Sequence, residues 1–246
     1  RTETGITNII IDTQATPISV SVDDGVFSPN GDGEQDTVTY TLDVPVRRGV
    51  ERWSFALRNE AGSTVRTFSG GDEVPDFLRF DGLTDAGAPV GEGSYSAELR
   101  LEYANGNRPS AEPPLVEVDL TTPSAAVRAD LTLFSPNGDG NKDVVTVFQE
   151  TSEEVLWTAT IRDADGVAVR TDTWRGLAEG RFEWDGRGED GLLVADGNYR
   201  YQLVATDRAG NTGFSNAVEV GLDMAETPVF LTTDATHFSP NGDGDL

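Results

Sequence analysis

The chain has 246 residues, with 43 Asp or Glu against 18 Lys or Arg, so its formal net charge is −25. This acidity argues against binding to nucleic acid or to an anionic membrane surface, because both require a basic surface. The chain has no cysteine and one histidine, which excludes disulfides, thiol catalysis and multi-histidine metal sites. No apolar run is long enough to span a bilayer, so we expect no membrane insertion. A globular protein that is not an enzyme is the class these numbers favour.

One heptapeptide, Phe-Ser-Pro-Asn-Gly-Asp-Gly, occurs three times, at 27–33, 134–140 and 238–244. Its spacings of 107 and 104 residues predict tandem structural units. A segment running from Asp to Pro precedes each copy, and an aromatic-Asp-Gly turn and a Gly-x-Tyr strand follow the first two copies. We therefore expect four segments, namely the last strand of a preceding repeat (1–11), repeat 1 (12–118), repeat 2 (119–222) and the start of a truncated third repeat (223–246).

Within each repeat, apolar residues alternate with polar ones, which predicts β-strands. This alternation covers 37–42, 52–58 and 95–101 in repeat 1, and 157–161 and 199–203 in repeat 2. Gly, Asn and Asp separate the segments and indicate turns. Roughly seven short strands in about 100 residues are typical of an immunoglobulin-like sandwich. The predicted fold class is all-β, as tandem immunoglobulin-like β-sandwiches with Trp53 and Trp157 in their cores.

Repeat 2 resembles the Ig-like domain of bacterial flagellar hook-capping proteins. The residues that carry this resemblance run from Trp157 to Gly166, from Phe182 to Arg187 and from Val194 to Tyr201. The heptapeptide, with an Asp nine residues after its Phe, is similar to the opening of gliding-motility-associated C-terminal domains. The resemblance implies an Ig-like fold and a place outside the cytoplasm: extracellular or at the cell surface, with the periplasm as the alternative. It does not imply a role in flagellar assembly.

The heptapeptide loops hold residue types that suit a calcium ion. Hard cations take several oxygen ligands from a loop that folds back on itself. In repeat 1, the side chains of Asn30, Asp32 and Asp36 stand at the third, fifth and ninth positions of an EF-hand count, and the Glu34 carbonyl stands at the seventh. The candidate ligands for Ca²⁺ in the three copies are Asp23, Asn30, Asp32, Glu34, Asp36, Asp130, Asn137, Asp139, Asn141, Asp143, Asp234, Asn241 and Asp243.

The loop also departs from an EF-hand. Ser28 stands where the first Asp belongs, and no Glu occupies the twelfth position, so we expect Asp23 to supply the missing charge. The alternative is a metal-free turn whose carboxylates accept backbone N–H groups, because Asn-Gly and Asp-Gly are also ordinary turn formers. Asp81 and Asp185, in the aromatic-Asp-Gly turns, are expected to cap those turns.

These features predict a non-enzymatic structural repeat in the fibre or stalk of a bacterial surface or secreted protein, stiffened by calcium. The expected partners are neighbouring repeats of the same chain, and a homo-oligomer or filament is the further option. Three alternatives stay open: an adhesion or carbohydrate-binding module that stacks ligands on Trp174 or Trp184, a self-assembling extracellular filament subunit, and an ancillary region of a secreted hydrolase. Exposed tryptophans would favour the first of these alternatives.

Overall fold

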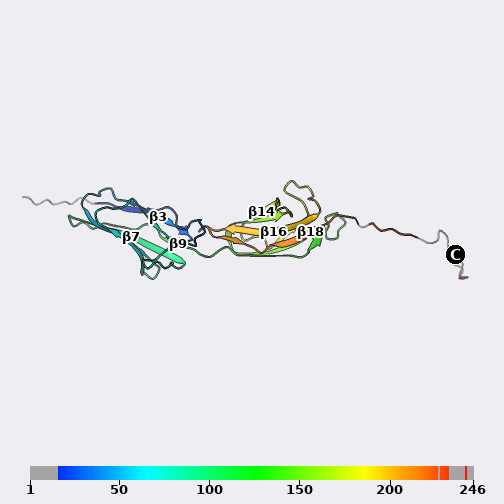
Figure 1. Cartoon of the computed structure of the whole chain (residues 1–246), viewed down its shortest axis with the longest axis horizontal. Helices are drawn as coiled ribbons and strands as arrows, with labels where there is room; N and C mark the ends of the chain where they lie inside the picture. Colours follow the sequence, from blue (N-terminus) through cyan, green and yellow to red (C-terminus); the bar gives the residue numbers. More distant parts are fainter. Residues whose placement is uncertain (1–15, 227, 233–241, 243–246) are drawn as a thin grey trace, which may run out of the picture.

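The computed structural model describes residues 16–226, 228–232 and 242. Within this part of the chain there are eighteen strands and no helix, and hence no helix that could cross a membrane. The strands form two β-sandwiches that lie end to end along the long axis of the molecule (Figure 1). The prediction of an all-β fold built from tandem sandwiches is confirmed.

The first sandwich contains the strands β1 (Ser19–Val22), β2 (Val26–Phe27), β3 (Val38–Asp43), β4 (Val50–Arg58), β5 (Thr64–Gly70), β6 (Phe77–Phe80), β7 (Gly93–Tyr103), β8 (Ser110–Ala111) and β9 (Val116–Val118). Its smaller sheet has the order β1-β3-β6, and its larger sheet has the order β2-β9-β7-β4-β5, with β8 paired to β7. Strand β2 runs parallel to β9, the last strand of the sandwich. The heptapeptide therefore leaves the sheet beside the chain segment that leads to the second sandwich.

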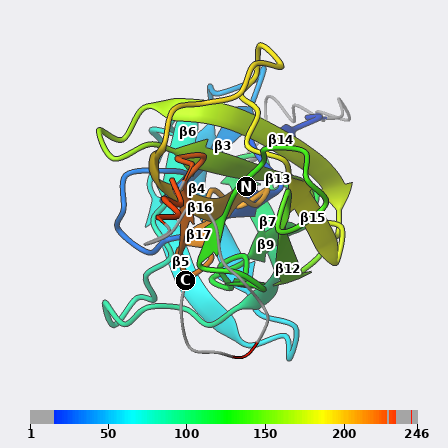
Figure 2. The same cartoon turned by 90° about the vertical axis from the view of Figure 1, so that its right-hand side faces the viewer.

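The second sandwich contains the strands β10 (Ala125–Ala129), β11 (Leu133–Phe134), β12 (Val145–Thr151), β13 (Glu154–Arg162), β14 (Ala168–Gly176), β15 (Arg181–Trp184), β16 (Gly197–Thr206), β17 (Thr212–Phe214) and β18 (Val218–Leu222). Its sheets have the orders β10-β12-β15 and β11-β18-β16-β13-β14, with β17 paired to β16. Strand β11 runs parallel to β18, as β2 does to β9. The two sandwiches therefore share one topology, and their outlines overlap in the view along the long axis (Figure 2).

Each sandwich has its own hydrophobic core, because every second side chain of its strands points inward. Trp53 and Trp157 are 8% and 0% exposed, so the prediction that both lie in the cores is confirmed. The heptapeptide contributes to each core through its first residue. Phe27 and Phe134 are each 1% exposed and pack with their rings 5.8 Å from Phe80 and 5.3 Å from Trp184. This burial anchors the start of each heptapeptide loop.

The proline of the heptapeptide packs against the aromatic-Asp-Gly turn. A Cβ on Gly82 would lie 2.4 Å from Cγ of Pro29, and Gly82 has a φ of +71°, so both space and backbone conformation require glycine there. Asp81 caps the same turn by accepting the N–H of Leu83 at 3.1 Å. The second sandwich repeats this arrangement with Pro136, Gly186, Asp185 and Arg187.

Candidate functional site

The first heptapeptide continues into a loop that is closed by its own backbone and by Asp36. The Ser28 N–H donates to the carbonyl of Gln35 at 3.0 Å, which joins the two ends of the loop. The two carboxylate oxygens of Asp36 accept the N–H groups of Gly31 at 2.6 Å and Gly33 at 2.8 Å. Asp36 therefore holds both glycines of the heptapeptide in place.

Asn30 and Asp32 complete the network inside this loop. Asn30 Oδ1 accepts the N–H of Asp32 at 2.9 Å, and Asn30 Nδ2 donates to Asp32 Oδ2 at 2.9 Å. Asp32 Oδ1 in turn accepts the N–H of Glu34 at 2.8 Å. The structure thus brings four of the predicted ligand residues into one loop. The side chains of Asn30, Asp32 and Asp36 accept backbone N–H groups there, and Glu34 donates its own N–H to Asp32.

The loop of repeat 2 has the same internal hydrogen bonds. Ser135 N–H donates to the carbonyl of Lys142 at 2.9 Å, and the carboxylate of Asp143 accepts the N–H groups of Gly138 at 2.8 Å and Gly140 at 2.7 Å. The bonds among Asn137, Asp139 and Asn141 also match those of the first loop. The repetition of the heptapeptide therefore reflects a repeated loop conformation.

Asp23, predicted to complete the ligand set, holds the strand after the loop. Its Oδ1 accepts the N–H groups of Asp24 and Thr39, each at 2.8 Å. Partial burial alone would raise the pKa of Asp23, but these hydrogen bonds outweigh burial and hold its pKa below the ordinary value. Asp130 likewise accepts the N–H of Thr146 at 2.8 Å.

Within the described residues, no group of three or more Asp, Glu or His side chains is arranged to hold a metal ion. The hydrogen bonds described above close both loops without a cation. Calcium binding, which would also use Asn side chains and backbone carbonyls, stays a prediction. The ligands predicted for the third copy, Asp234, Asn241 and Asp243, lie outside the described residues, as does the strand predicted at 1–11.

The first heptapeptide loop meets the second sandwich at Asn211. Ser28 Oγ donates to Asn211 Oδ1 at 2.6 Å, and Asn30 Nδ2 donates to the same oxygen at 3.2 Å. Asn211 Nδ2 donates to the carbonyl of Asp119 at 3.0 Å and to Asp207 Oδ2 at 2.9 Å. Ser28 is 0% exposed and Asn211 is 1% exposed. One buried side chain therefore joins the loop of repeat 1, the linker between β9 and β10 (residues 119–124) and the hairpin turn of repeat 2.

The hairpin turn Asp207–Asn211 has a shape that allows this close approach. Its Gly210 has a φ of +91°, and a Cβ there would lie 3.4 Å from the carbonyl oxygen of Glu34 and from Cβ of Gln35. A Cβ on Gly213, in β17, would lie 1.8 Å from the carbonyl oxygen of Pro123 in the linker. Glycine is required at Gly213 because the linker backbone passes directly over it.

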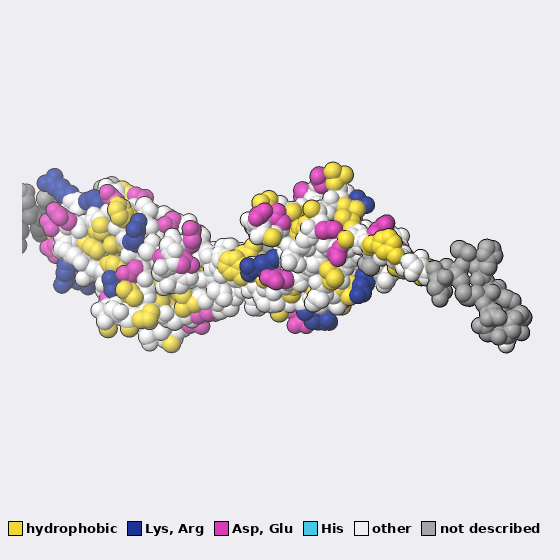
Figure 3. Space-filling model, turned by 45° about the vertical axis from the view of Figure 1, so that its right-hand side comes forward, with side chains coloured by type: hydrophobic (Ala, Val, Ile, Leu, Met, Phe, Trp, Pro, Cys, Tyr) yellow, Lys and Arg dark blue, Asp and Glu magenta, His cyan; other side chains and the backbone are white. Residues whose placement is uncertain are grey.

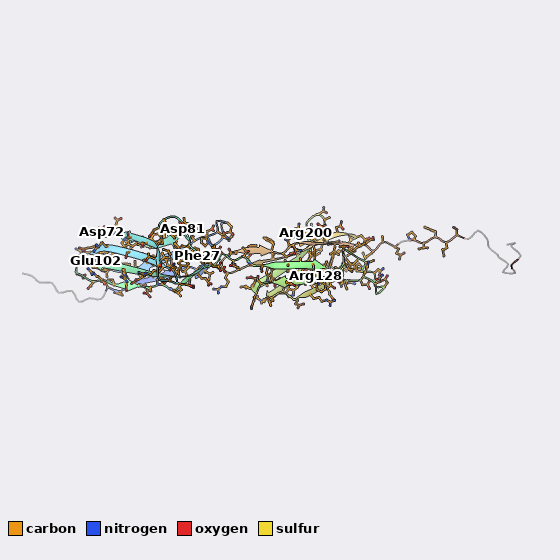
Figure 4. All side chains as sticks on the ribbon, turned by 90° about the horizontal axis from the view of Figure 1, so that it is seen from below. Phe27, Asp72, Asp81, Glu102, Arg128 and Arg200 are labelled. Atoms are coloured by element: carbon orange, nitrogen blue, oxygen red, sulfur yellow. The ribbon has the colours of Figure 1, made fainter. Side chains whose placement is uncertain are left out.

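The linker is held to the first sandwich by further hydrogen bonds. The Asp119 N–H donates to the carbonyl of Phe27 at 3.1 Å, and Asp119 Oδ1 accepts the N–H of Thr121 at 2.9 Å. Thr121 Oγ1 donates to Glu92 Oε2 at 2.9 Å. Figure 3 shows the narrow waist between the two sandwiches, and Figure 4 places Phe27 toward this waist and Glu102 at the opposite end of the first sandwich. The connection is narrow, but hydrogen bonds hold the linker to the first sandwich and to Asn211 of the second.

Sequence reasoning did not single out Ser28 as a contact or Asn211 at all. A signal was present, because the Asn of Gly210-Asn211 lies twelve residues after Tyr199, just as the Asn of Gly106-Asn107 lies twelve residues after Tyr95. A Gly-Asn pair repeated at a fixed offset indicates a shared structural role. The sequence does not reveal this role, because it depends on the contact between Ser28 and Asn211, which are 183 positions apart.

The tryptophans give little support to a stacking platform for carbohydrate. Trp184 is 2% exposed, and its Nε1–H donates to the carbonyl of Arg187 at 2.9 Å. Trp174 is partly buried and packs edge-on against Phe182, with their ring centroids 6.0 Å apart. Trp184 is therefore too buried to stack on a sugar ring, and Trp174 is only partly exposed.

An open hollow of about 690 Å³ lies over β4, β5 and β7 of the first sandwich. Its charged side chains already pair with one another, since Glu98 bonds to Arg58 and Arg100 and Glu102 bonds to Arg52 and Arg108. Such pairs leave little unsatisfied charge for a ligand.

Curated relatives match part of the chain. A C5a peptidase of Streptococcus pyogenes serotype M18 (strain MGAS8232) is 32% identical in an alignment 125 residues long, which covers 41% of this chain and 11% of that protein. A C5a peptidase of S. pyogenes serotype M1 is 34% identical in an alignment 91 residues long, which covers 30% of this chain and 8% of that protein. The chain thus spans about a tenth of the length of the curated relatives it matches.

Solved structures align over most of the chain at low similarity. A tetra-tandem repeat in the extending region of a large adhesion protein aligns with a TM-score of 0.37 and 21% identity, covering 86% of this chain and 50% of that chain. Fibronectin(III)-like modules of Clostridium thermocellum CbhA align with a TM-score of 0.41 and 14% identity, covering 82% of this chain and 92% of that chain. A family model matches more specifically, because residues 132–209 fit the FlgD Ig-like domain. The second sandwich therefore carries the sequence pattern of the FlgD Ig-like domain family, as its resemblance to hook-capping proteins predicted.

Proposed function

We propose that the two sandwiches form a non-enzymatic spacer, a stiff segment that holds other parts of a bacterial surface or secreted protein apart. The observation that carries this proposal is the buried contact of Asn211 with Ser28, Asn30 and the Asp119 carbonyl. A flexible connection would leave these polar groups in water. Their burial at the junction favours one fixed orientation of the second sandwich relative to the first.

The number and the placement of the bonds support stiffness. Three hydrogen bonds cross from Asn211 to the first sandwich and its linker, and each contributes about 0.5–1.5 kcal/mol net. Bending at the waist would leave the buried Ser28 hydroxyl without a partner, which costs about 1–3 kcal/mol. The contact of Gly210 with the first loop and of Gly213 with the linker adds close packing on the same side of the second sandwich.

A spacer attached to a catalytic domain is the second candidate. The curated relatives named peptidases match the chain over only 8–11% of their own length. This short match favours a module that accompanies an enzyme over the enzyme itself. The proposed location is extracellular or at the cell surface, where the acidity of the chain would keep an extended protein soluble.

Calcium is a separate part of the proposal. Each oxygen of Asp36 accepts one N–H group, and a carboxylate oxygen has a second lone pair. A Ca²⁺ ion bound by Asn30, Asp32, the Glu34 carbonyl and Asp36 would stiffen a loop that hydrogen bonds already close. The spacer function does not depend on this ion.

Backbone ¹⁵N relaxation in the intact chain tests the spacer proposal. We expect the amides of both sandwiches to fit one elongated rotational diffusion tensor, because the junction makes them tumble as one body. The variant Asn211→Ala should decouple the two sandwiches and give each a shorter correlation time. If the two sandwiches of the unmodified chain tumble independently, the junction is flexible and the proposal is wrong.

A further inference from the structure

The end of the second sandwich that faces away from the first carries a copy of the surface that forms the junction. This distal pole consists of the loop Ser135–Asp143 and the chain segment Asp223–Ala225. We infer that the distal pole is a docking surface for a further unit of the same kind, which contacts it through a Gly-Asn hairpin turn like Asp207–Asn211. The inference rests on the proposed spacer function and extends it to a contact not yet described.

The loop of the distal pole already has the conformation that the first loop has in contact with Asn211. The bonds from Ser135 N–H to the Lys142 carbonyl and from Asn137 N–H to the Ser135 carbonyl, at 2.9 and 2.8 Å, match those of the first loop at 3.0 and 2.8 Å. Ser135 and Asn137 therefore present the same two donor groups that Ser28 and Asn30 direct at Asn211. Unlike Ser28, Ser135 is partly exposed.

The chain also leaves both sandwiches in the same way. The Asp223 N–H donates to the carbonyl of Phe134 at 3.1 Å, as Asp119 does to Phe27 at 3.1 Å. Asp223 Oδ1 accepts the N–H of Ala225 at 2.9 Å, the counterpart of the Asp119–Thr121 bond at 2.9 Å. The carbonyl of Asp223 is thus the acceptor of the surface, equivalent to the Asp119 carbonyl that accepts from Asn211 Nδ2.

The sequence identifies what would occupy this surface. Asp223 precedes the third heptapeptide by fifteen residues, as Asp119 precedes the second and Asp12 the first. The segment that leaves the distal pole therefore repeats the opening of the units that precede it, which favours a following unit of this chain over an unrelated protein. Lys142 replaces Gln35 at the position that contacts Gly210, and both have a left-handed φ, of 56° and 46°. The incoming turn thus meets the same backbone shape and needs a glycine at the same place.

A chain with one more unit tests the inference. A second copy of residues 125–228 is inserted after Pro228, so that Asp223–Ala225 stay at the new junction and the whole natural chain is kept. Arg200 of the second unit and the same residue of the inserted unit are replaced by cysteine and carry spin labels. Double electron–electron resonance then measures the distance between the two labels across the new junction. In a separate chain, labels at Ser96 and Arg200 report the original junction. Ser96 and Arg200 are exposed and equivalent positions, and the chain has no cysteine of its own.

We expect both distance distributions to be equally narrow. Replacing Ser135 and Asn137 by Ala in the second unit should broaden the new distribution severalfold and leave the original one unchanged. A narrow original distribution with a broad new one would overturn the inference and leave the spacer function intact, whereas two broad distributions would overturn both. A new distribution that stays narrow in the double variant would show that docking does not use this loop. Concentration-dependent association of the two-unit chain through its distal pole would assign the surface to a second copy instead.

Discussion

The hydrogen bond between Ser28 and Asn211 offers the sharpest test of the junction, because it joins the two sandwiches. Ser135, the equivalent serine of the second heptapeptide, makes no such bond to Asn211 and serves as the control. Ser28→Ala and Asn211→Ala form a double-mutant cycle across the waist. Ser135→Ala and Asn211→Ala form the control cycle, since Ser135 occupies the same place in its heptapeptide but lies at the far end of the second sandwich. Both serines close their loops through their backbone N–H groups, which the substitutions retain.

The expected magnitudes follow from the bonds that each variant removes. Asn211 makes four side-chain hydrogen bonds, so Asn211→Ala should lower the free energy of unfolding of the second sandwich by about 4 kcal/mol at about 1 kcal/mol per bond. Ser28→Ala should cost about 1 kcal/mol, and the coupling between the two substitutions should also be about 1 kcal/mol. The control cycle should show a coupling near zero, because distant sites act independently.

Urea unfolding followed by tryptophan fluorescence measures these values, since three of the four tryptophans lie in the second sandwich. Circular dichroism of the same samples reports the unfolding of both sandwiches, so a transition that circular dichroism shows and fluorescence shows only weakly belongs to the first sandwich. A Ser28–Asn211 coupling no larger than that of the control cycle would refute the claim that this contact holds the two sandwiches together.

Three further predictions concern the linker, the acid response and calcium. Gly213→Ala should lower the melting temperature of the second sandwich, at a cost of about 1–3 kcal/mol, because its Cβ would overlap the Pro123 carbonyl; an unchanged melting curve would contradict this. The pKa of Asp23 is lowered on folding, so its contribution is present above the unfolded pKa and is lost as pH falls through the folded one. Asp23→Asn should therefore destabilise the protein at pH 7 and make its free energy of unfolding fall less steeply below about pH 4. A decrease as steep as that of the unmodified chain would argue against this role of Asp23. Chelation should lower the melting temperature and added Ca²⁺ should restore it, because binding at a hundredfold excess over Kd raises the free energy of unfolding by about 2.7 kcal/mol. A variant with both Asp32→Ala and Asp139→Ala should not respond to Ca²⁺. If chelator leaves the melting of the unmodified chain unchanged, the loop is a hydrogen-bonded turn without calcium.

The sequence predicted most of the fold because its signals are local. Alternation along β7 places Tyr95, Ala97, Leu99 and Leu101 in the core, and a period of two is visible without knowing any partner strand. The aromatic-Asp-Gly turns were predicted as capped turns, but the reason for their glycine was not. That reason is the approach of Pro29, more than fifty residues earlier in the sequence.

The loop was predicted only in part. Asn30, Asp32 and Asp36 do belong together, because their spacing lets side-chain oxygens reach backbone N–H groups within one turn. The same spacing also suits a calcium ion, and sequence alone does not separate the two chemistries. The junction could not be predicted, since Ser28 and Asn211 acquire their role only when two complete sandwiches meet.

The distance distribution between spin labels at Ser96 and Arg200 tests the central claim most directly, because it reports how firmly the second sandwich is held against the first. We expect one narrow distribution in the unmodified chain and a severalfold broader one in Asn211→Ala, with both sandwiches still folded. A broad distribution in the unmodified chain, or a narrow one that Asn211→Ala leaves unchanged, would contradict it.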